Sequence, residues 1–230
     1  MTNALFVVSE RGYWGEECIE PLLALDEAGV DATVVTPTGE PPVVDERSID
    51  PEAVGKEVAS RVTECDANDE RLADPEPIAT VDAADYDAVV FPGGHGTAWD
   101  VNTDRHARQL LAETVDGEAG IALVVCHAVG LLGFTHDDSG EYLVAGRDVT
   151  GFPNAWEADI VDEHDRMPDG RKLPYLVEDE VINAGGNWDA ELDSETSVNV
   201  DGDLITARGP ESSAAAAETL LEELGVETSA

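Results

Sequence analysis

The sequence predicts an α/β fold in which a mostly parallel sheet carries helices on both faces. Short apolar runs of strand length alternate along the chain with stretches whose apolar residues recur at helical spacing, a pattern typical of such sheets. The chain has 230 residues, enough to bury a sizeable core in one large domain. Ligands bind at the carboxyl ends of the strands in these folds. We therefore expect functional residues in the loops at that edge.

The first elements are a strand at 4–9, a helix and a second strand at 32–36. Both strands are short apolar runs, and breakers follow the second one. The helix is predicted to end at Gly29 from apolar residues that recur at roughly helical spacing, namely Cys18, Ile19, Leu22, Leu23, Leu25 and Ala28.

The segment 37–80 differs from the rest of the chain because it is acidic and contains several breakers. We interpret it as an insertion into a single domain that spans 1–230. Asp50 can cap a helix whose first position is Pro51. The insertion is therefore expected to carry a helix over 51–62.

Alternation resumes after the insertion. A strand at 86–91 ends in a glycine-rich loop, a helix is predicted at about 103–114, and the apolar run 121–125 is the next strand. The remaining predicted elements are a helix at 174–183, strands at 197–199 and 204–207 around a turn at 201–203, and a helix at 211–224 closed by Gly225.

The charge of the chain excludes several classes of partner. The 51 acidic residues against 12 Lys plus Arg give a formal net charge of -39, which argues against nucleic acid and against anionic membranes. The acids are dispersed, as on a solvated surface, and we interpret them as the surface of a cytoplasmic protein from a salt-loving organism. Three cysteines without a CxxC pair favour a reducing compartment. Neither a signal peptide nor a membrane span is expected.

The pair Cys126-His127 follows the 121–125 strand and precedes a short stretch compatible with a helix. A cysteine at such a turn lies above the carboxyl edge of the sheet, near a helix N-terminus that favours a thiolate. This setting suits a nucleophile. The alternative is that Cys126 is a buried core thiol and His127 a core histidine.

Two other loops at the same edge hold candidate residues. Gly94, with the amide of His127, could form an oxyanion site, because glycine admits the backbone conformation that such a loop requires. Glu17 could act as a general base, although a carboxylate at a helix start is more often a favourable partner of the helix dipole. Glu157 is a candidate only as the carboxylate that orients the imidazole of His127. The side chains and backbone expected to line the substrate pocket belong to Tyr13, Trp14, Gly93 and His95.

Several segments resemble the ThiJ/PfpI superfamily, and more narrowly its heat-shock branch, whose members are described as glyoxalase III enzymes, deglycases and holding chaperones. The segments are GYWGEECIEP (12–21), TPTGEPPVVDERSIDPE (36–52), FPGGHGTAWD (91–100), VVCHAVGLL (124–132), GRDVTGFPNAWE (146–157) and DGDLITARGPESSAAAAETLL (201–221). The resemblance implies a flavodoxin-like fold with Cys126 as nucleophile, His127 as acid/base and Glu157 as the third member. It also implies that Glu17 lies against the thiol.

The sequence departs from the family pattern at a few points. Ala128-Val129 follows Cys-His where Gly and Pro are common. Arg208 lies in a divergent loop, where it could bring a positive charge near an anionic product, although an ion pair on the surface is its expected role. A metal site of some relatives needs a His and Glu cluster. The five histidines show no HxxxH spacing, so we expect no metal and no cofactor.

The residues and the resemblance together predict a cofactor-independent cysteine enzyme of the glyoxalase III or deglycase type, which acts on small dicarbonyls such as methylglyoxal. Glutamine amidotransfer is disfavoured because an HxE pattern is missing at His164. An intracellular peptidase, a stress chaperone and a cysteine redox sensor remain alternatives. A homodimer is expected from the resemblance.

Overall fold

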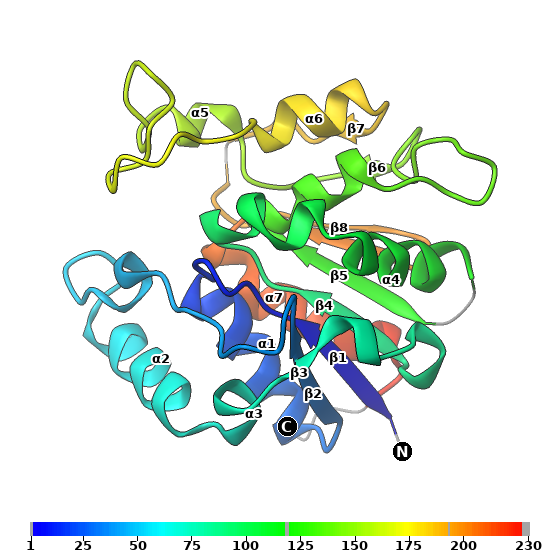
Figure 1. Ribbon diagram of the computed structural model, residues 1–230, viewed down its shortest axis with the longest axis horizontal. Helices are drawn as coiled ribbons and strands as arrows, with labels where there is room; N and C mark the ends of the chain where they lie inside the picture. The colour runs from blue at the N-terminus through cyan, green and yellow to red at the C-terminus, as the bar shows by residue number, and fades with distance from the viewer. Residues whose placement is uncertain (1, 118–119, 193, 227–230) are drawn as a thin grey trace.

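The computed structural model describes residues 2–117, 120–192 and 194–226. A seven-stranded sheet forms its centre (Figure 1), in the order β3-β2-β1-β4-β5-β9-β8. The strands are β1 (Asn3–Val7), β2 (Asp31–Thr36), β3 (Glu76–Pro77), β4 (Ala88–Phe91), β5 (Ile121–Val125), β8 (Val198–Asp201) and β9 (Leu204–Ala207). Every paired neighbour is parallel except β8 with β9. The predicted α/β fold with a mostly parallel sheet is confirmed.

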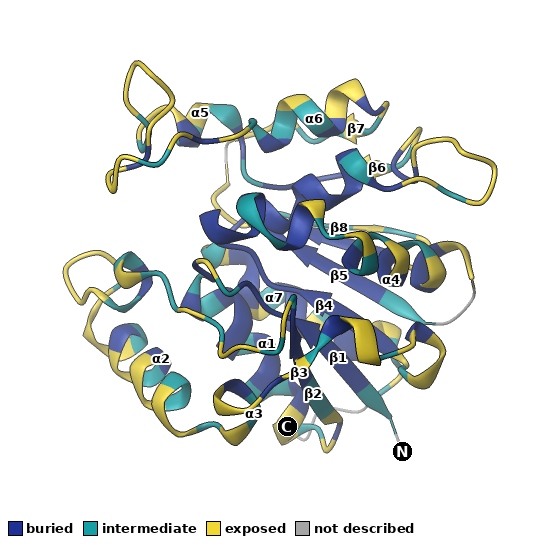
Figure 2. Ribbon diagram, viewed as in Figure 1, coloured by how far each residue is buried: buried dark blue, intermediate teal, exposed yellow. Residues whose placement is uncertain are grey.

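Helices cover both faces of this sheet, because successive side chains of a strand point to opposite sides. Along β1, Leu5 and Val7 belong to one buried apolar cluster, whereas Ala4 and Phe6 belong to the other. The first cluster is completed by α4 (Arg105–Asp116) and α6 (Val177–Asn183), and the second by α1 (Gly15–Glu27) and α7 (Ser213–Glu223). Figure 2 shows the strands buried throughout the centre, with exposed residues on the outer helices.

The predicted start of the helix in segment 37–80 is wrong. The Asp50 side chain does accept from the amide of Glu52, at 2.9 Å, but this closes a single turn. Gly55 then takes a φ of +83°, and α2 runs from there as Lys56–Asn68. A positive φ is open to glycine at little cost, so the glycine and not the proline sets the start of the helix.

Other boundaries differ by a few residues. The side chain of Asp104 caps α4 by accepting from the amide of His106 at 2.7 Å, which moves the start of that helix. Elements not predicted from the sequence include α3 (Glu70–Ala73), α5 (Asn154–Glu157) and a small parallel pair of strands, β6 (Asp148–Val149) with β7 (Asn187–Trp188). The edge strand β3 was not predicted either, and it joins segment 37–80 to the central sheet by pairing with β2. In the described parts of the chain, no helix combines the length and the apolar character needed to cross a bilayer.

Candidate active site

Cys126 lies at the carboxyl end of β5, where the chain turns into a 3₁₀ helix, Cys126–Phe134, which we call the elbow helix. Its φ is +56°, a strained value for a residue with a Cβ and one that often marks a functional site. The strand and turn were predicted; the helix after them is 3₁₀ along its length. Sγ of Cys126 lies 3.2 Å from Nδ1 of His127.

A chain of hydrogen bonds extends from this pair. Nε2 of His127 lies 2.6 Å from Oε2 of Glu157, and Nε2 of His95 lies 2.9 Å from Oε1 of the same carboxylate. Each of these residues, and Cys126 with them, is at most 3% exposed. The residues come from three separate loops, at the ends of β4 and β5 and at α5. We call Cys126, His127, Glu157 and His95 the relay.

Glu157 remains ionised at the centre of the relay. Burial opposes its charge, but the hydrogen bonds from His127 and His95 outweigh that effect and hold the pKa of Glu157 well below its ordinary value. Burial and the neighbouring His127 lower the pKa of His95 to about 4. A charged carboxylate therefore faces the imidazole that contacts the thiol.

Sequence reasoning missed three residues that hold the relay in place. Phe152 stacks on the ring of His127 with centroids 4.4 Å apart, and Nδ2 of Asn102 donates to the carbonyl of His127 at 2.7 Å. Nη2 of Arg47 lies 2.9 Å from Nδ1 of His95. Phe152 and Arg47 lie within the segments that resemble the family, but nothing local in the sequence distinguishes them.

Glu17 and Cys126 lie on either side of Gly93. A Cβ built at position 93 would lie 2.5 Å from Oε2 of Glu17 and 2.8 Å from Cβ of Cys126. Both carboxylate oxygens of Glu17 are buried without a hydrogen-bond partner of good geometry among the described residues. Burial raises the pKa of Glu17 to about 8, against weaker opposing contacts with the Cys126 thiol and the Gly93 amide.

The expectation that the turn favours a thiolate is wrong for the free protein. Burial, followed by the proximity of Glu17, raises the pKa of the Cys126 thiol well above its ordinary value, while the amides of His127 and Gly94 act in the opposite direction. Desolvation exceeds the effect of a short helix terminus here. The resting pair of Cys126 and Glu17 therefore holds protons at neutral pH, and the thiolate must form during reaction.

Hydrogen bonding from the amides of Gly94 and His127 opposes the effect of burial on the pKa of the Cys126 thiol. Gly94 has a φ of +102° and begins a 3₁₀ turn, His95–Trp99. A Cβ at position 94 would lie 2.4 Å from the backbone nitrogen of Trp14. Only glycine fits this close approach of two loops.

The residues expected in the substrate pocket separate into two groups. Gly93 and His95 lie against the relay, as described above. Tyr13 is fully buried and its hydroxyl donates to Asp66 on α2 at 2.5 Å, so this side chain points into the packing of α1 against α2. The Trp14 ring lies at the start of α1, 5.6 Å from the guanidinium of Arg47.

The predicted surface position of Arg208 is wrong. Arg208 is 1% exposed, and its guanidinium donates to Oδ2 of Asp189 and to the carbonyl of Ser194, each at 2.7 Å. Its carbon Cζ lies 5.8 Å from the Trp156 ring. The ion pair with Asp189 is therefore buried on its arginine side and lies near the residue that precedes Glu157.

His95, His127 and Glu157 also bring atoms of metal-ligand type within 4.8 Å of one another. The cluster has no HxxxH spacing because its members come from separate loops. Arg47 opposes a metal ion there, however. A histidine that ligates through Nε2 donates its other N–H to an acceptor, whereas a guanidinium can only donate. We interpret the cluster as a hydrogen-bonded relay.

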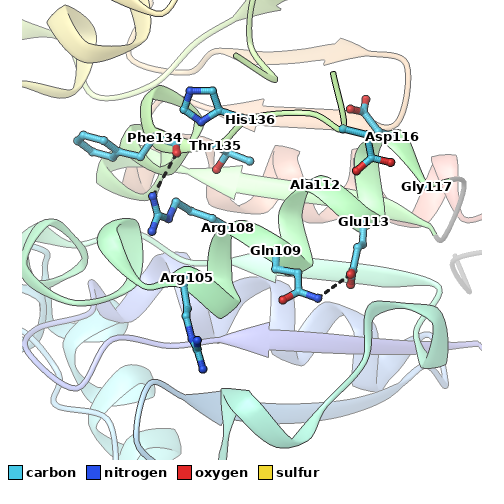
Figure 3. A pocket seen from close by; sticks show the side chains of 11 residues that line it. Arg105, Arg108, Gln109, Ala112, Glu113, Asp116, Gly117, Phe134, Thr135 and His136 are labelled. Atoms are coloured by element: carbon cyan, nitrogen blue, oxygen red, sulfur yellow. Dashed lines mark hydrogen bonds between the residues drawn. The ribbon is translucent and has the colours of Figure 1, made fainter. Parts of the chain in front are cut away.

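Two cavities of about 490 Å³ each lie outside the relay. One is shown in Figure 3, between α4 and the end of the elbow helix; Arg105 and Arg108 contribute to its lining, but Glu113, Asp116 and Asp138 balance their charge. Nothing in it selects a ligand. The other cavity is lined in part by Arg47, which contacts His95 of the relay.

A family model for DJ-1/PfpI matches residues 2–223. This chain belongs to the DJ-1/PfpI family, which confirms the resemblance to the ThiJ/PfpI superfamily. Glyoxalase 3 of Candida albicans is 31% identical over 147 residues, 61% of this chain and 59% of that protein. The probable glutathione-independent glyoxalase of Schizosaccharomyces pombe is 27% identical over 146 residues, 63% of this chain and 64% of that protein. The matches thus span about three fifths of these relatives.

The crystal structure of glyoxalase III from Candida albicans has the same fold. It superimposes with a TM-score of 0.80 at 22% identity, over 96% of this chain and 97% of that one. The likeness covers the whole sheet and its helices.

Proposed function

We propose that this protein is a glutathione-independent glyoxalase, which converts a small 2-oxoaldehyde such as methylglyoxal to the 2-hydroxy acid. The observation that carries the proposal is the pair of contacts from Cys126 to His127 and from His127 to Glu157, at 3.2 and 2.6 Å. A thiol, a base and an orienting carboxylate in this order form an activated nucleophile. The glyoxalases among its relatives support the same chemistry.

The first step forms a carbon–sulfur bond. Nδ1 of His127 takes the thiol proton as Sγ of Cys126 attacks the aldehyde carbon, and Glu157 stabilises the resulting imidazolium. The amides of Gly94 and His127 hold the oxyanion. His127 then returns the proton to that oxygen, which leaves a neutral hemithioacetal and a neutral imidazole.

The second step moves a proton between adjacent carbons. Ionised Glu17 removes the C–H proton of the hemithioacetal and delivers it to the neighbouring carbon, so Glu17 ends as it began. His127 carries the hydroxyl proton from the first oxygen to the former ketone oxygen, which leaves a thioester carbonyl and a 2-hydroxyl group. A base with a pKa near 8 suits this task better than an ordinary carboxylate. Water, activated by His127, then hydrolyses the thioester to the hydroxy acid, and the proton returns to the Cys126 sulfur.

Lactate formation from methylglyoxal without glutathione tests the proposal. Cys126→Ala should lose at least about 1,000-fold in kcat/KM because no covalent intermediate can form. Cys65→Ala is the matched control, since Cys65 is half-buried and lies on α2, away from the relay. Equal turnover by wild type and Cys126→Ala would refute the enzymatic proposal, and aggregation of a client protein suppressed equally by both would then favour the chaperone.

The raised pKa of Cys126 argues against a redox sensor, because oxidation starts from a thiolate that is already formed. The thiol is 3% exposed and its pKa is raised. Prolonged exposure to peroxide should therefore oxidise Cys65 before Cys126. We retain the homodimer as a further proposal, for which sedimentation equilibrium at high salt is the test.

A further inference from the structure

Arg47 belongs to segment 37–80 and yet contacts the relay. It lies in the 3₁₀ turn Glu46–Ile49, and Nη2 of its guanidinium is 2.9 Å from Nδ1 of His95. Sequence reasoning assigned no role to this segment. The contact therefore connects it to the proposed site.

The chemistry of the two groups fixes the position of a proton. A guanidinium has only N–H donors and stays charged, so Nδ1 of His95 must accept. The proton of neutral His95 then resides on Nε2, which lies 2.9 Å from Oε1 of Glu157 and donates to it. Glu157 thus receives one N–H from each of two histidines.

We propose that Arg47 is a positioning residue that fixes His95 as the Nε2–H tautomer and thereby holds Glu157 as an anion directed at His127. This inference rests on the proposed function, which gives the relay its task. With Nε2–H of His127 donated to Glu157, the lone pair on Nδ1 faces the thiol and can accept its proton. Three hydrogen bonds, through His95 and Glu157, separate Arg47 from the imidazole of His127.

Arg47 is itself held firmly. Nε and Nη2 donate to the two carboxylate oxygens of Asp45 at 2.9 and 2.5 Å, a bidentate geometry that restricts the guanidinium. The backbone amide of Asp45 donates to the carbonyl of Tyr13 at 2.8 Å, and Oγ of Ser48 accepts from the amide of Gly15 at 3.0 Å. These bonds attach the turn to the loop before α1.

The groups facing His95 explain what Arg47 prevents. They are Glu157 from α5, His127 from the elbow helix and Arg47, with Asp45 behind the guanidinium. Without Arg47, Nδ1 of His95 could take a second proton in mild acid. The imidazolium would neutralise Glu157, and His127 would become a weaker base toward Cys126.

Arg47→Met tests the inference, with Arg171→Met as the matched control. Arg171 lines the same cavity as Arg47, but its guanidinium pairs with Asp169 and lies 4.2 Å from the Trp99 ring. Relative to wild type at the same pH, Arg47→Met should lose about tenfold in kcat at pH 6, less at pH 8, with KM little changed. Arg171→Met should stay within about twofold at both. Arg47→Lys, which keeps one donor, should recover part of the loss.

A second substitution isolates the role of the tautomer. A glutamine side chain has an acceptor oxygen and a donor NH₂ group, and it cannot take a second proton. In a His95→Gln background, Arg47→Met should therefore no longer change the shape of the pH profile. If Arg47→Met loses the same factor at pH 6 and pH 8 in the wild-type background, the inference is overturned.

Nitrogen-15 NMR of the histidine side chains decides the matter without substrate. The wild-type spectrum should show neutral His95 with the proton on Nε2 down to about pH 5, and Arg47→Met should show a mixed or protonated ring. A wild-type His95 with its proton on Nδ1 would refute the role of Arg47. Because this readout needs no turnover, it stands even if methylglyoxal is not a substrate.

Discussion

Glu17 and Cys126 face each other across Gly93, with no room between them for a single methyl group. A Cβ at position 93 would lie 2.5 Å from both Oε2 of Glu17 and the carbonyl oxygen of Val125, far inside van der Waals contact. Gly93→Ala should therefore displace the strand end that positions the nucleophile. We expect kcat/KM to fall by about 100-fold, since displacements near 1 Å have such effects.

Gly209→Ala is the control for this prediction. Its added Cβ would meet nothing closer than 3.8 Å, an ordinary contact, and its backbone is extended, with a φ of -178°. Steady-state kinetics and thermal denaturation of the two variants should show a loss of activity for Gly93→Ala alone. Equal kinetics in both would mean that Glu17 and Cys126 do not need their present separation.

The activity should rise with pH up to about 8. Glu17 must be ionised to remove the C–H proton, and burial raises its pKa to about 8, so only about a tenth of the protein is in the active form at pH 7. A plot of log kcat/KM against pH should have a slope near one below this value. Glu27→Gln, exposed at the far end of α1, should keep the profile, and Glu17→Gln should lose it together with most of the activity. A flat profile from pH 6 to 8 would remove Glu17 from the mechanism.

The same carboxyl should make the stability of the protein depend on pH. Its pKa is raised from 4.5 to about 8 in the folded state, so the folded form binds its proton more tightly than the unfolded form. The stabilisation is complete below about pH 4.5 and is lost as the pH rises to 8, at up to ~1.4 kcal/mol per pH unit. In denaturant unfolding, the stability of Glu17→Gln relative to wild type should increase as the pH rises from 4.5 to about 8. A constant difference between the two would contradict the raised pKa.

Local sequence patterns predicted the nucleophile, whereas the residues that hold it in place depend on contacts between distant parts of the sequence. Cys126-His127 follows a buried strand, and Gly93-Gly94 follows another, so alternation alone brings both to one edge of the sheet. Glu157 required the resemblance, because one acid among 51 carries no local signal. The bonds of His95 to Glu157 and Arg47 join residues 62 and 48 positions apart, and no periodicity encodes them.

The backbone conformation of Cys126 should lower the free energy of unfolding. Its φ of +56° is unfavourable by about 1 kcal/mol for a residue with a Cβ. Cys126→Gly should therefore be more stable than Cys126→Ala by about 0.5–1 kcal/mol, although neither can catalyse. Ala128→Gly, buried two residues further in the elbow helix, should instead destabilise by about 1 kcal/mol. Chemical denaturation measures all three; a Cys126→Gly variant less stable than Cys126→Ala would mean that no strain is stored there.

The net charge of -39 should make folding depend on salt. Carboxylates repel one another over a Debye length of ~30 Å at 0.01 M salt but only ~3 Å at 1 M, so the melting temperature should rise steeply between these concentrations. Glu222→Lys with Glu223→Lys tests the cause, because both residues are exposed at the carboxyl end of α7, where the helix dipole also disfavours an acid. This variant should melt higher at low salt and depend less on salt, with the Gln pair intermediate. A melting temperature that is independent of salt in all three proteins would refute the proposed adaptation to high salt.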